Sequence, residues 1–281
     1  MAIHLATKFE TKTSQLLKAK RKSKEFTNQD WDWDGNNAII VSTLTDPTMG
    51  DYDVNAVTSR YGNSSEVEDT QQTWTLTRDR AWTKSMDKKN IQDAMAIRKP
   101  GAYLAQATKN VLVPEIDTYI FQTIATTGAV YDRDDIATDA ATTASNAYSN
   151  FLLLTANITN NEAPEEGRVA AMTAAYYNFL KQSGFVLDSP AAYADRKSGD
   201  LGTVDNCKVV IVPSSRMPTT SGAIDLLISH PSATAAPEKL VDYTLHNNPV
   251  GISGNLLEYR HRYDAFVDVN RVNCIAMHAV S

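Results

Sequence analysis

The sequence predicts a mixed α+β fold that carries one long extended excursion, and three observations support this. Helix-like and strand-like segments alternate through the second half of the 281-residue chain, as in α+β domains. All four tryptophans lie in the N-terminal third, around a polar stretch without a core pattern of its own; they are Trp31, Trp33, Trp74 and Trp82. The sign of the charge also changes in blocks along the first 113 residues.

Composition allows a buried core and excludes several classes of protein. Hydrophobic residues make up 42% of the chain and charged residues 21%, which is ordinary for a globular protein. The formal net charge of −6 argues against a general nucleic-acid binder. No apolar run approaches the length of a membrane span, and residues 1–10 contain no apolar core of a signal peptide, so we expect no membrane and a reducing cytoplasm. Cys207 and Cys274 are predicted to be small apolar residues in strands.

The charge blocks indicate complementary docking between subunits. Residues 1–25 hold seven basic residues and two acidic ones, and residues 31–74 hold eight acidic residues and one base, Arg60. Residues 75–113 reverse the sign again, with eight bases against three acids. Any one block could be solvated surface, but three alternating blocks favour docking of an acidic ribbon on a basic region of another copy.

The extended excursion begins with a strand over residues 38–44, which is rich in β-branched residues. Residues 46–51 predict a turn, and residues 73–77 a returning strand. A two-stranded ribbon of about fifteen residues per arm would reach roughly 50 Å at ~3.3 Å per residue. Such a ribbon is not stable alone, so we expect a neighbouring subunit to support it. Tryptophan is enriched at such contacts.

Helical periodicity begins near Asn90, is interrupted at Pro100-Gly101 and resumes from Tyr103 to Leu112. Pro114, followed by acidic residues, predicts a helix start, and Gly128 predicts its end. The second half predicts helices over 146–159 and 174–182. It also predicts strands over 167–172, 209–213, 223–229, 240–246 and 256–278.

The motifs of common enzymes and metal sites are missing. The five histidines form no HxxxH or HExxH pattern, and no Walker A, GxGxxG or GxSxG motif occurs. A triad could be drawn from Ser229, His230 and an aspartate, but any chain of this size offers such sets. Asp132, Asp134 and Asp135 indicate a solvated turn rather than a cation loop. We therefore expect no enzyme activity, no cofactor and no metal.

Several local phrases occur in an order that resembles the HK97-like fold of tailed-phage major capsid proteins. They are Thr45-Asp46-Pro47-Thr48-Met49-Gly50-Asp51-Tyr52-Asp53, Leu76-Thr77-Arg78-Asp79-Arg80, Met86-Asp87, Val113-Pro114-Glu115-Ile116-Asp117-Thr118-Tyr119, Val210-Ile211-Val212-Pro213-Ser214, Ile228-Ser229-His230-Pro231-Ser232-Ala233 and Tyr263-Asp264-Ala265-Phe266-Val267. The resemblance covers nearly the whole chain. Each phrase is weak alone, and their order carries the resemblance.

The resemblance implies four parts. Residues 1–30 would be an N-terminal arm and residues 31–82 the E-loop, an extended β-hairpin. Residues 83–145 and 247–281 would form the P-domain with the long spine helix, and residues 146–246 the A-domain. The family builds icosahedral shells of hexamers and pentamers around double-stranded DNA.

The resemblance also implies partners and a location. They are further copies of this chain, a portal, a decoration protein, and packaged DNA on the inner face. Because the ribbon begins within about forty residues of Met1, either a separate scaffolding protein or the short arm itself would guide assembly. The protein would be found in the virion after assembly in the bacterial cytoplasm. An encapsulin-like compartment, which shares the fold but encloses an enzyme, is the alternative. A soluble hydrolase is the alternative from a different class.

Eight residues are predicted to make contacts between subunits. The ribbon contacts are Trp33, Tyr52, Arg60 and Trp74, and the charge partners are Arg78, Arg80, Lys84 and Lys88. Some members of the family crosslink a ribbon lysine to a neighbour's asparagine. Residues 35–74 contain no lysine, so we expect no covalent crosslink through the E-loop.

Overall fold

A computed structural model describes residues 20–28, 37–62, 64–89, 100–134, 141–183, 202–219 and 222–280. The chain divides into two compact units, residues 32–77 and the remainder. The first is called the hairpin and the second the body. None of the helices in the described ranges is long and apolar enough to span a bilayer.

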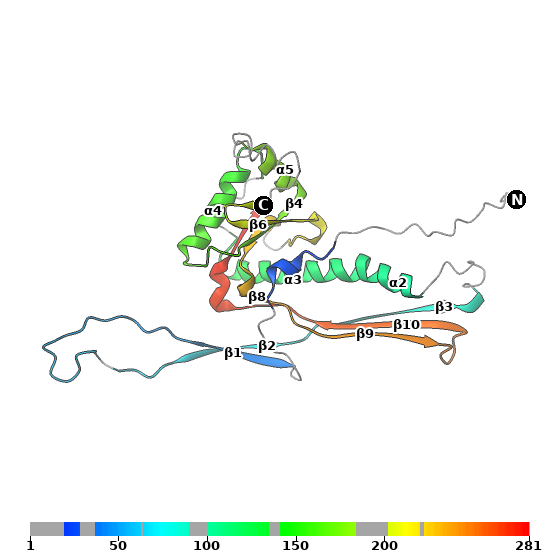
Figure 1. Ribbon diagram of the computed structural model, residues 1–281, viewed down its shortest axis with the longest axis horizontal. Helices are drawn as coiled ribbons and strands as arrows, with labels where there is room; N and C mark the ends of the chain where they lie inside the picture. The colour runs from blue at the N-terminus through cyan, green and yellow to red at the C-terminus, as the bar shows by residue number, and fades with distance from the viewer. Residues whose placement is uncertain are drawn as a thin grey trace. The chain divides into compact units, whose positions relative to one another are not determined.

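The hairpin consists of two short antiparallel strands and a long connection (Figure 1). Strands β1 (Ala38–Leu44) and β2 (Asp69–Thr75) pair from Ala38 opposite Thr75 to Leu44 opposite Asp69. The strand predicted over 38–44 is confirmed, whereas the returning strand begins earlier than predicted. The prediction of about fifteen strand residues per arm is wrong. Each strand has seven residues, and the connection between them lies outside the ladder.

One sheet of the body has three antiparallel strands in the order β3–β10–β9, which are Asp79–Asp87, Gly254–Tyr263 and Glu238–Asn247. Helices α2 (Pro100–Ala107) and α3 (Val113–Val130) run along this sheet (Figure 1). Aromatic side chains join the layers: Trp82 stacks on Tyr259 and meets Tyr103 edge-on. Strand β3 was not predicted; its sequence is largely polar, and only Met86 in it is buried.

A π-helical turn, η2 (Thr108–Leu112), joins the two helices. Pro114 has no N–H, so the carbonyl four residues earlier loses its α-helical partner. Here the N–H of Val113 instead donates to the carbonyl of Thr108, five residues back, which is the π pattern. Pro100 opens α2 where the sequence predicted an interruption. The helix predicted to begin near residue 90 falls, as far as residue 99, outside the residues that the structure describes.

The second sheet of the body has five strands in the order β12–β7–β4–β6–β5. Their bounds are Ile275–Val280, Ala223–Ser229, Val169–Thr173, Cys207–Val212 and Thr203–Val204. Helices α4 (Ala147–Asn160) and α5 (Ala174–Gln182) belong to this half (Figure 1). The remaining elements are β8 (Thr234–Ala235), β11 (Phe266–Val267) and the 3₁₀ turns η1 (Ser23–Phe26), η3 (Ser214–Arg216), η4 (Pro231–Ala233) and η5 (Val269–Cys274).

Helices cover both faces of the five-stranded sheet. Successive strand residues point to opposite faces, and on β12 the side chain of Met277 lies against α3 while His278 bonds to Asn150 of α4. Gly128 therefore does not end α3 as predicted. It lies within the helix, where an added Cβ would meet the Met277 Cε at 2.8 Å, so glycine here permits close helix–sheet packing.

Most of the predicted elements in the second half are confirmed, and one is divided. The predicted helices over 146–159 and 174–182 match α4 and α5, and the strand over 223–229 matches β7. The long strand predicted over 256–278 is instead β10, β11, η5 and β12. The two cysteines are free and buried. Cys207 lies in β6 as predicted, whereas Cys274 ends η5 and is not in a strand. Burial raises the pKa of the Cys207 thiol to about 11.

Candidate assembly surfaces

The hairpin strands have one covered face and one open face. Val41 and Trp74 are buried and share a face, because Ile39 pairs with Trp74 and Val41 with Gln72. Trp74, a predicted contact residue, is 6% exposed. The opposite face of β1 leaves Ile40 and Leu44 open to solvent. An amphipathic strand with an apolar open face is typical of a surface that another chain covers.

The connection between the strands, residues 45–68 (the tip), is ordered by its own contacts. The Asp53 N–H donates to the Arg60 carbonyl at 3.1 Å, and the Asn55 N–H to the Asp53 carboxylate at 2.9 Å. Tyr52 and Tyr61 meet edge-on with ring centroids 5.0 Å apart. The tip is thus preorganised, which lowers the entropy lost on binding.

The tip combines acidic charge with exposed apolar side chains. Val57 is 98% exposed and Tyr61 89% exposed. The acidic residues of the strands and tip are all exposed; they are Asp46, Asp51, Asp53, Glu66, Glu68 and Asp69. Such a surface fits a partner that offers both basic groups and apolar area. Tyr61, Val57 and the open face of β1 were missed by sequence reasoning, although the alternation of residues 38–44 could have indicated the open face.

Two of the predicted charge partners lie together in the body, on the side of β3 that faces α3. Arg78 and Arg80 both donate to Glu115, at 2.9 and 2.7 Å. Arg78 also donates to the Tyr263 hydroxyl at 3.0 Å and lies 4.1 Å above the Tyr119 ring. Burial disfavours the charges of Arg78 and Glu115, yet these bonds outweigh it, raising the pKa of Arg78 and lowering the pKa of Glu115.

The four predicted basic residues therefore differ in availability. Arg78 is committed to contacts inside the body. The side chain of Arg80 is 57% exposed although it bonds to Glu115, and Lys84 on β3 and Lys88 just beyond it are exposed. Arg60 and Tyr52 lie on the tip. Trp33 lies outside the described residues.

The chain enters the body through a polar clamp. The buried carboxylate of Asp117 on α3 accepts from the N–H groups of Lys22 and Ser23 at 3.0–3.1 Å. It also accepts from Arg216 at 2.9 Å, and this guanidinium bonds to the Lys20 carbonyl. Phe26 then packs edge-on against Phe121, with ring centroids 5.3 Å apart. This clamp fixes the point at which the predicted N-terminal arm joins α3.

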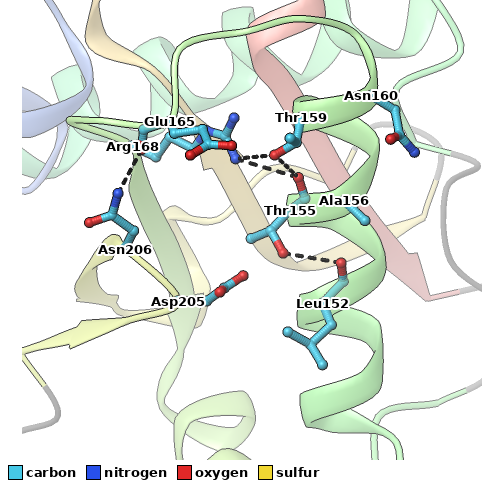
Figure 2. A pocket seen from close by; sticks show the side chains of 9 residues that line it. All are labelled: Leu152, Thr155, Ala156, Thr159, Asn160, Glu165, Arg168, Asp205 and Asn206. Atoms are coloured by element: carbon cyan, nitrogen blue, oxygen red, sulfur yellow. Dashed lines mark hydrogen bonds between the residues drawn. The ribbon is translucent and has the colours of Figure 1, made fainter.

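A cavity of about 450 Å³ lies between α4 and the β5–β6 turn, and Figure 2 shows the nine side chains that line it. Arg168 is buried there, and its guanidinium donates to the carbonyls of Ala163, Thr155 and Pro164 and to the Thr159 hydroxyl. The guanidinium of Arg168 is therefore used in hydrogen bonds that hold the end of α4 in place. The residues that line the cavity include no histidine, serine or cysteine.

Two histidine clusters elsewhere in the body also hold structure together. The Nδ1 of His230 bonds to Ser232 at 2.7 Å, whereas the hydroxyl of Ser229 donates to a carbonyl, so the triad drawn from Ser229 and His230 does not form. His278 is fully buried. Its ring bonds to Asp225 at 2.6 Å and to Asn150 at 3.3 Å. No group of three or more metal-ligating side chains occurs in the described ranges.

Comparison with known proteins gives structural but not sequence matches. No family profile and no curated protein matches the chain. A solved structure from Mycobacterium phage Che8 has a TM-score of 0.75 at 18% identity and covers 98% of this chain and 96% of that chain.

Two capsid structures are similar over nearly the same length. The capsid of cyanophage P-SCSP1u gives a TM-score of 0.70 at 13% identity, with 97% of this chain and 93% of that chain covered. The mature capsid of bacteriophage PhiM1 gives 0.67 at 14% identity, with 99% and 92% covered. The chain therefore has the mixed α+β fold of phage capsid structures.

Proposed function

We propose that this chain is the major capsid protein of a tailed phage and assembles into an icosahedral shell of hexamers and pentamers around the genome. The observation that carries the proposal is the similarity to capsid structures over 97–99% of the chain. The exposed apolar tip of the hairpin supports it, because such side chains in an acidic loop favour burial against another subunit.

In this proposal the chain has the four HK97-like parts, with the spine helix formed by α2, η2 and α3. Sheet pairing favours two boundaries that differ from those implied by the resemblance. Trp82 lies on β3 and pairs with β10, so the E-loop would end at about residue 77. Strand β9 pairs with β10 as well, so the A-domain would end at about residue 237.

The hairpin of one subunit would dock on the body of its neighbour. Tyr52, Arg60 and the open side chains of the tip would supply contact area, with Trp33 and Trp74 nearby in sequence. Arg80, Lys84 and Lys88 would receive the acidic residues. Removing one partner of a desolvated pair costs about 2–5 kcal/mol, whereas pairs at the rim contribute under about 1 kcal/mol.

Other partners follow from the same role. A separate scaffolding protein would guide assembly in the bacterial cytoplasm, a portal would occupy one vertex, and a decoration protein could bind the outer face. Double-stranded DNA would fill the virion. The basic residues 8–24 would approach DNA or scaffold, and a contact with phosphates would weaken as salt rises.

Negative-stain microscopy of the purified chain tests the proposal. We expect closed shells or ring-shaped capsomers. A discrete small species at all concentrations, with or without scaffold, would contradict a capsid role and favour the hydrolase alternative. Shells that retain an enzyme cargo and exclude DNA would favour the encapsulin-like compartment.

A further inference from the structure

The outer edges of β9 and β1 are among the sheet edges in the described part of the chain that have no hydrogen-bonded neighbour. Strand β9 ends the three-stranded sheet on one side, and β1 has only β2 beside it. An edge strand presents a row of free N–H and C=O groups that can pair with another chain. β9 is ten residues long, at the upper end of the usual range of strand length.

The backbone bonds show which residues face each open edge. In an antiparallel ladder, successive residues direct their N–H and C=O groups alternately to one neighbour and to the other. Thr45 donates to Glu68 and Leu76 to Asn37, so the odd-numbered residues of the β1 segment bond to β2 and the even-numbered ones face the open edge.

The same reasoning applies to β9. Asn248 donates to Gly254, so the even-numbered residues of β9 bond to β10. The odd-numbered residues therefore direct their backbone groups outward. An antiparallel pairing of β1 with β9 must accordingly set even residues of β1 opposite odd residues of β9.

The side chains select one such register. Val241 and Leu245, 61% and 40% exposed, lie four residues apart on β9, and the exposed Ile40 and Leu44 lie four residues apart on β1. Four residues span about 13 Å of strand. The register that sets Leu44 opposite Val241 also sets Ile40 opposite Leu245.

This register also aligns opposite charges. Two residues beyond Leu44, Asp46 comes opposite Lys239, while Ser42 faces Tyr243. Moving the pairing by two residues would oppose Leu44 to Lys239 or to Tyr243 and lose both apolar pairs. A parallel pairing would keep the apolar pairs but set Asp46 opposite Asn247 without the charge pair.

We propose that β1 of a second copy pairs antiparallel with β9, with Leu44 opposite Val241, and joins the two sheets across the subunit boundary. This rests on the proposed shell function and names the surface that receives the hairpin strand. It satisfies both open edges and covers four exposed apolar side chains, each of which contributes through burial.

Single cysteines on separate chains test the register. Thr43 and Asp242 would be opposite each other at a position without direct hydrogen bonds, where Cα atoms lie near 4.5 Å, within reach of a disulfide. Thr43→Cys and Asp242→Cys chains are mixed, assembled and oxidised, and the shells are then run on a denaturing gel without reductant. We expect a disulfide-linked dimer, which neither single variant forms alone.

The matched control replaces Thr43→Cys with Ser42→Cys, which points to the other face. It should give about tenfold less dimer, because its Cβ is directed away from residue 242. Shells that form without dimer, or with equal dimer in the control, overturn the proposed register and leave the capsid function intact. An intrachain disulfide in the Thr43→Cys/Asp242→Cys double variant, with none in the mixture, overturns pairing between copies. Absence of any assembly contradicts the proposed function itself, and the inference falls with it.

Discussion

In the body, apolar side chains fill both faces of a five-stranded sheet, whereas in the hairpin many of them point into solvent. Strand β4 is buried along its whole length, and Phe121 and Phe151 are fully buried beside the sheet. In the tip, Val57 and Tyr61 are almost fully open. A side chain stabilises only what buries it, so the body stabilises itself while the tip can gain stability only from a partner.

The polar contacts follow the same division. The body joins distant parts of the chain through buried groups, as Asp117 does for Arg216 and residues 22–23. The tip joins near neighbours, as in the bond from Asp53 to Arg60. Changes in the body should therefore alter folding, and changes in the tip should alter assembly.

The largest expected effect comes from shortening the hairpin. Replacing residues 46–67 with Asn-Gly closes the hydrogen-bonded pair of Thr45 and Glu68 with a two-residue turn. We expect shell formation to be lost, because the tip contacts are absent, while the thermal midpoint of the chain stays within a few degrees. Microscopy and calorimetry measure the two outcomes. Normal shells from the shortened chain would show that the tip is dispensable.

Next in size is Asp117→Ala. It removes the acceptor of Arg216 and of two backbone N–H groups, and leaving a buried charge without its partner costs about 3–5 kcal/mol. Urea denaturation of the unassembled chain measures the loss. Asp79→Ala, which breaks the exposed pair with Arg260, is the control and should change the midpoint little. Equal losses of stability in the two variants would contradict the claim that the buried contacts of Asp117 matter more than the exposed pair of Asp79.

Gly254→Ala should destabilise the body by about 1–3 kcal/mol through overpacking. An added Cβ would lie 2.0 Å from the Met86 carbonyl oxygen of β3, and backbone cannot move aside as a side chain can. Gly101→Ala, where nothing lies within 4 Å, is the control and should be neutral or stabilising by up to about 1 kcal/mol in a helix. If denaturation shows equal stability for both, the close approach of β10 to β3 is wrong.

Acid should weaken the body through Glu238. His261 and Arg21 lower the pKa of this carboxyl to about 2 despite its partial burial. A depressed pKa gives stability that is complete above the unfolded value of about 4.3 and is lost as the pH falls towards 2. The stability difference between wild type and Glu238→Gln should thus shrink between pH 4.5 and 2 in urea denaturation. A difference that is constant over this range would refute the linkage.

The smallest effect on folding is expected from Arg80→Glu. The Arg80 side chain is 57% exposed and Arg78 still pairs with Glu115, so losing the Arg80 pair should cost the unassembled chain under about 1 kcal/mol. Assembly should fail at physiological salt, because an acid then faces the acidic tip of the neighbour. Light scattering across a salt series measures the extent of assembly. Unaffected assembly would remove electrostatics from the account of docking.

The sequence predicted elements well where a local signal decided them. Strand 38–44 follows from its β-branched residues, and α5 follows from periodicity and from Thr173, whose hydroxyl accepts from the Tyr176 N–H. Strand β3 could not be predicted in this way, since most of its side chains are exposed and its pairing with β10 joins residues far apart in the chain.

Among the candidate residues, the sequence indicated the acidic hairpin and the basic residues after it, because charge blocks are visible in one dimension. It did not show that Arg78 and Arg80 share Glu115, or that Tyr52 meets Tyr61. Those pairings depend on how strands and turns bring distant residues together.

By itself, the sequence determined the mixed α+β class, the polar excursion and its charge, since composition and periodicity depend only on neighbours along the chain. The tertiary structure alone decided that Gly128 serves close packing and not the end of a helix. It alone left β1 and β9 as open edges with matching side chains. The reason is physical: burial and strand pairing are properties of contacts between segments, and no local pattern records which segments meet.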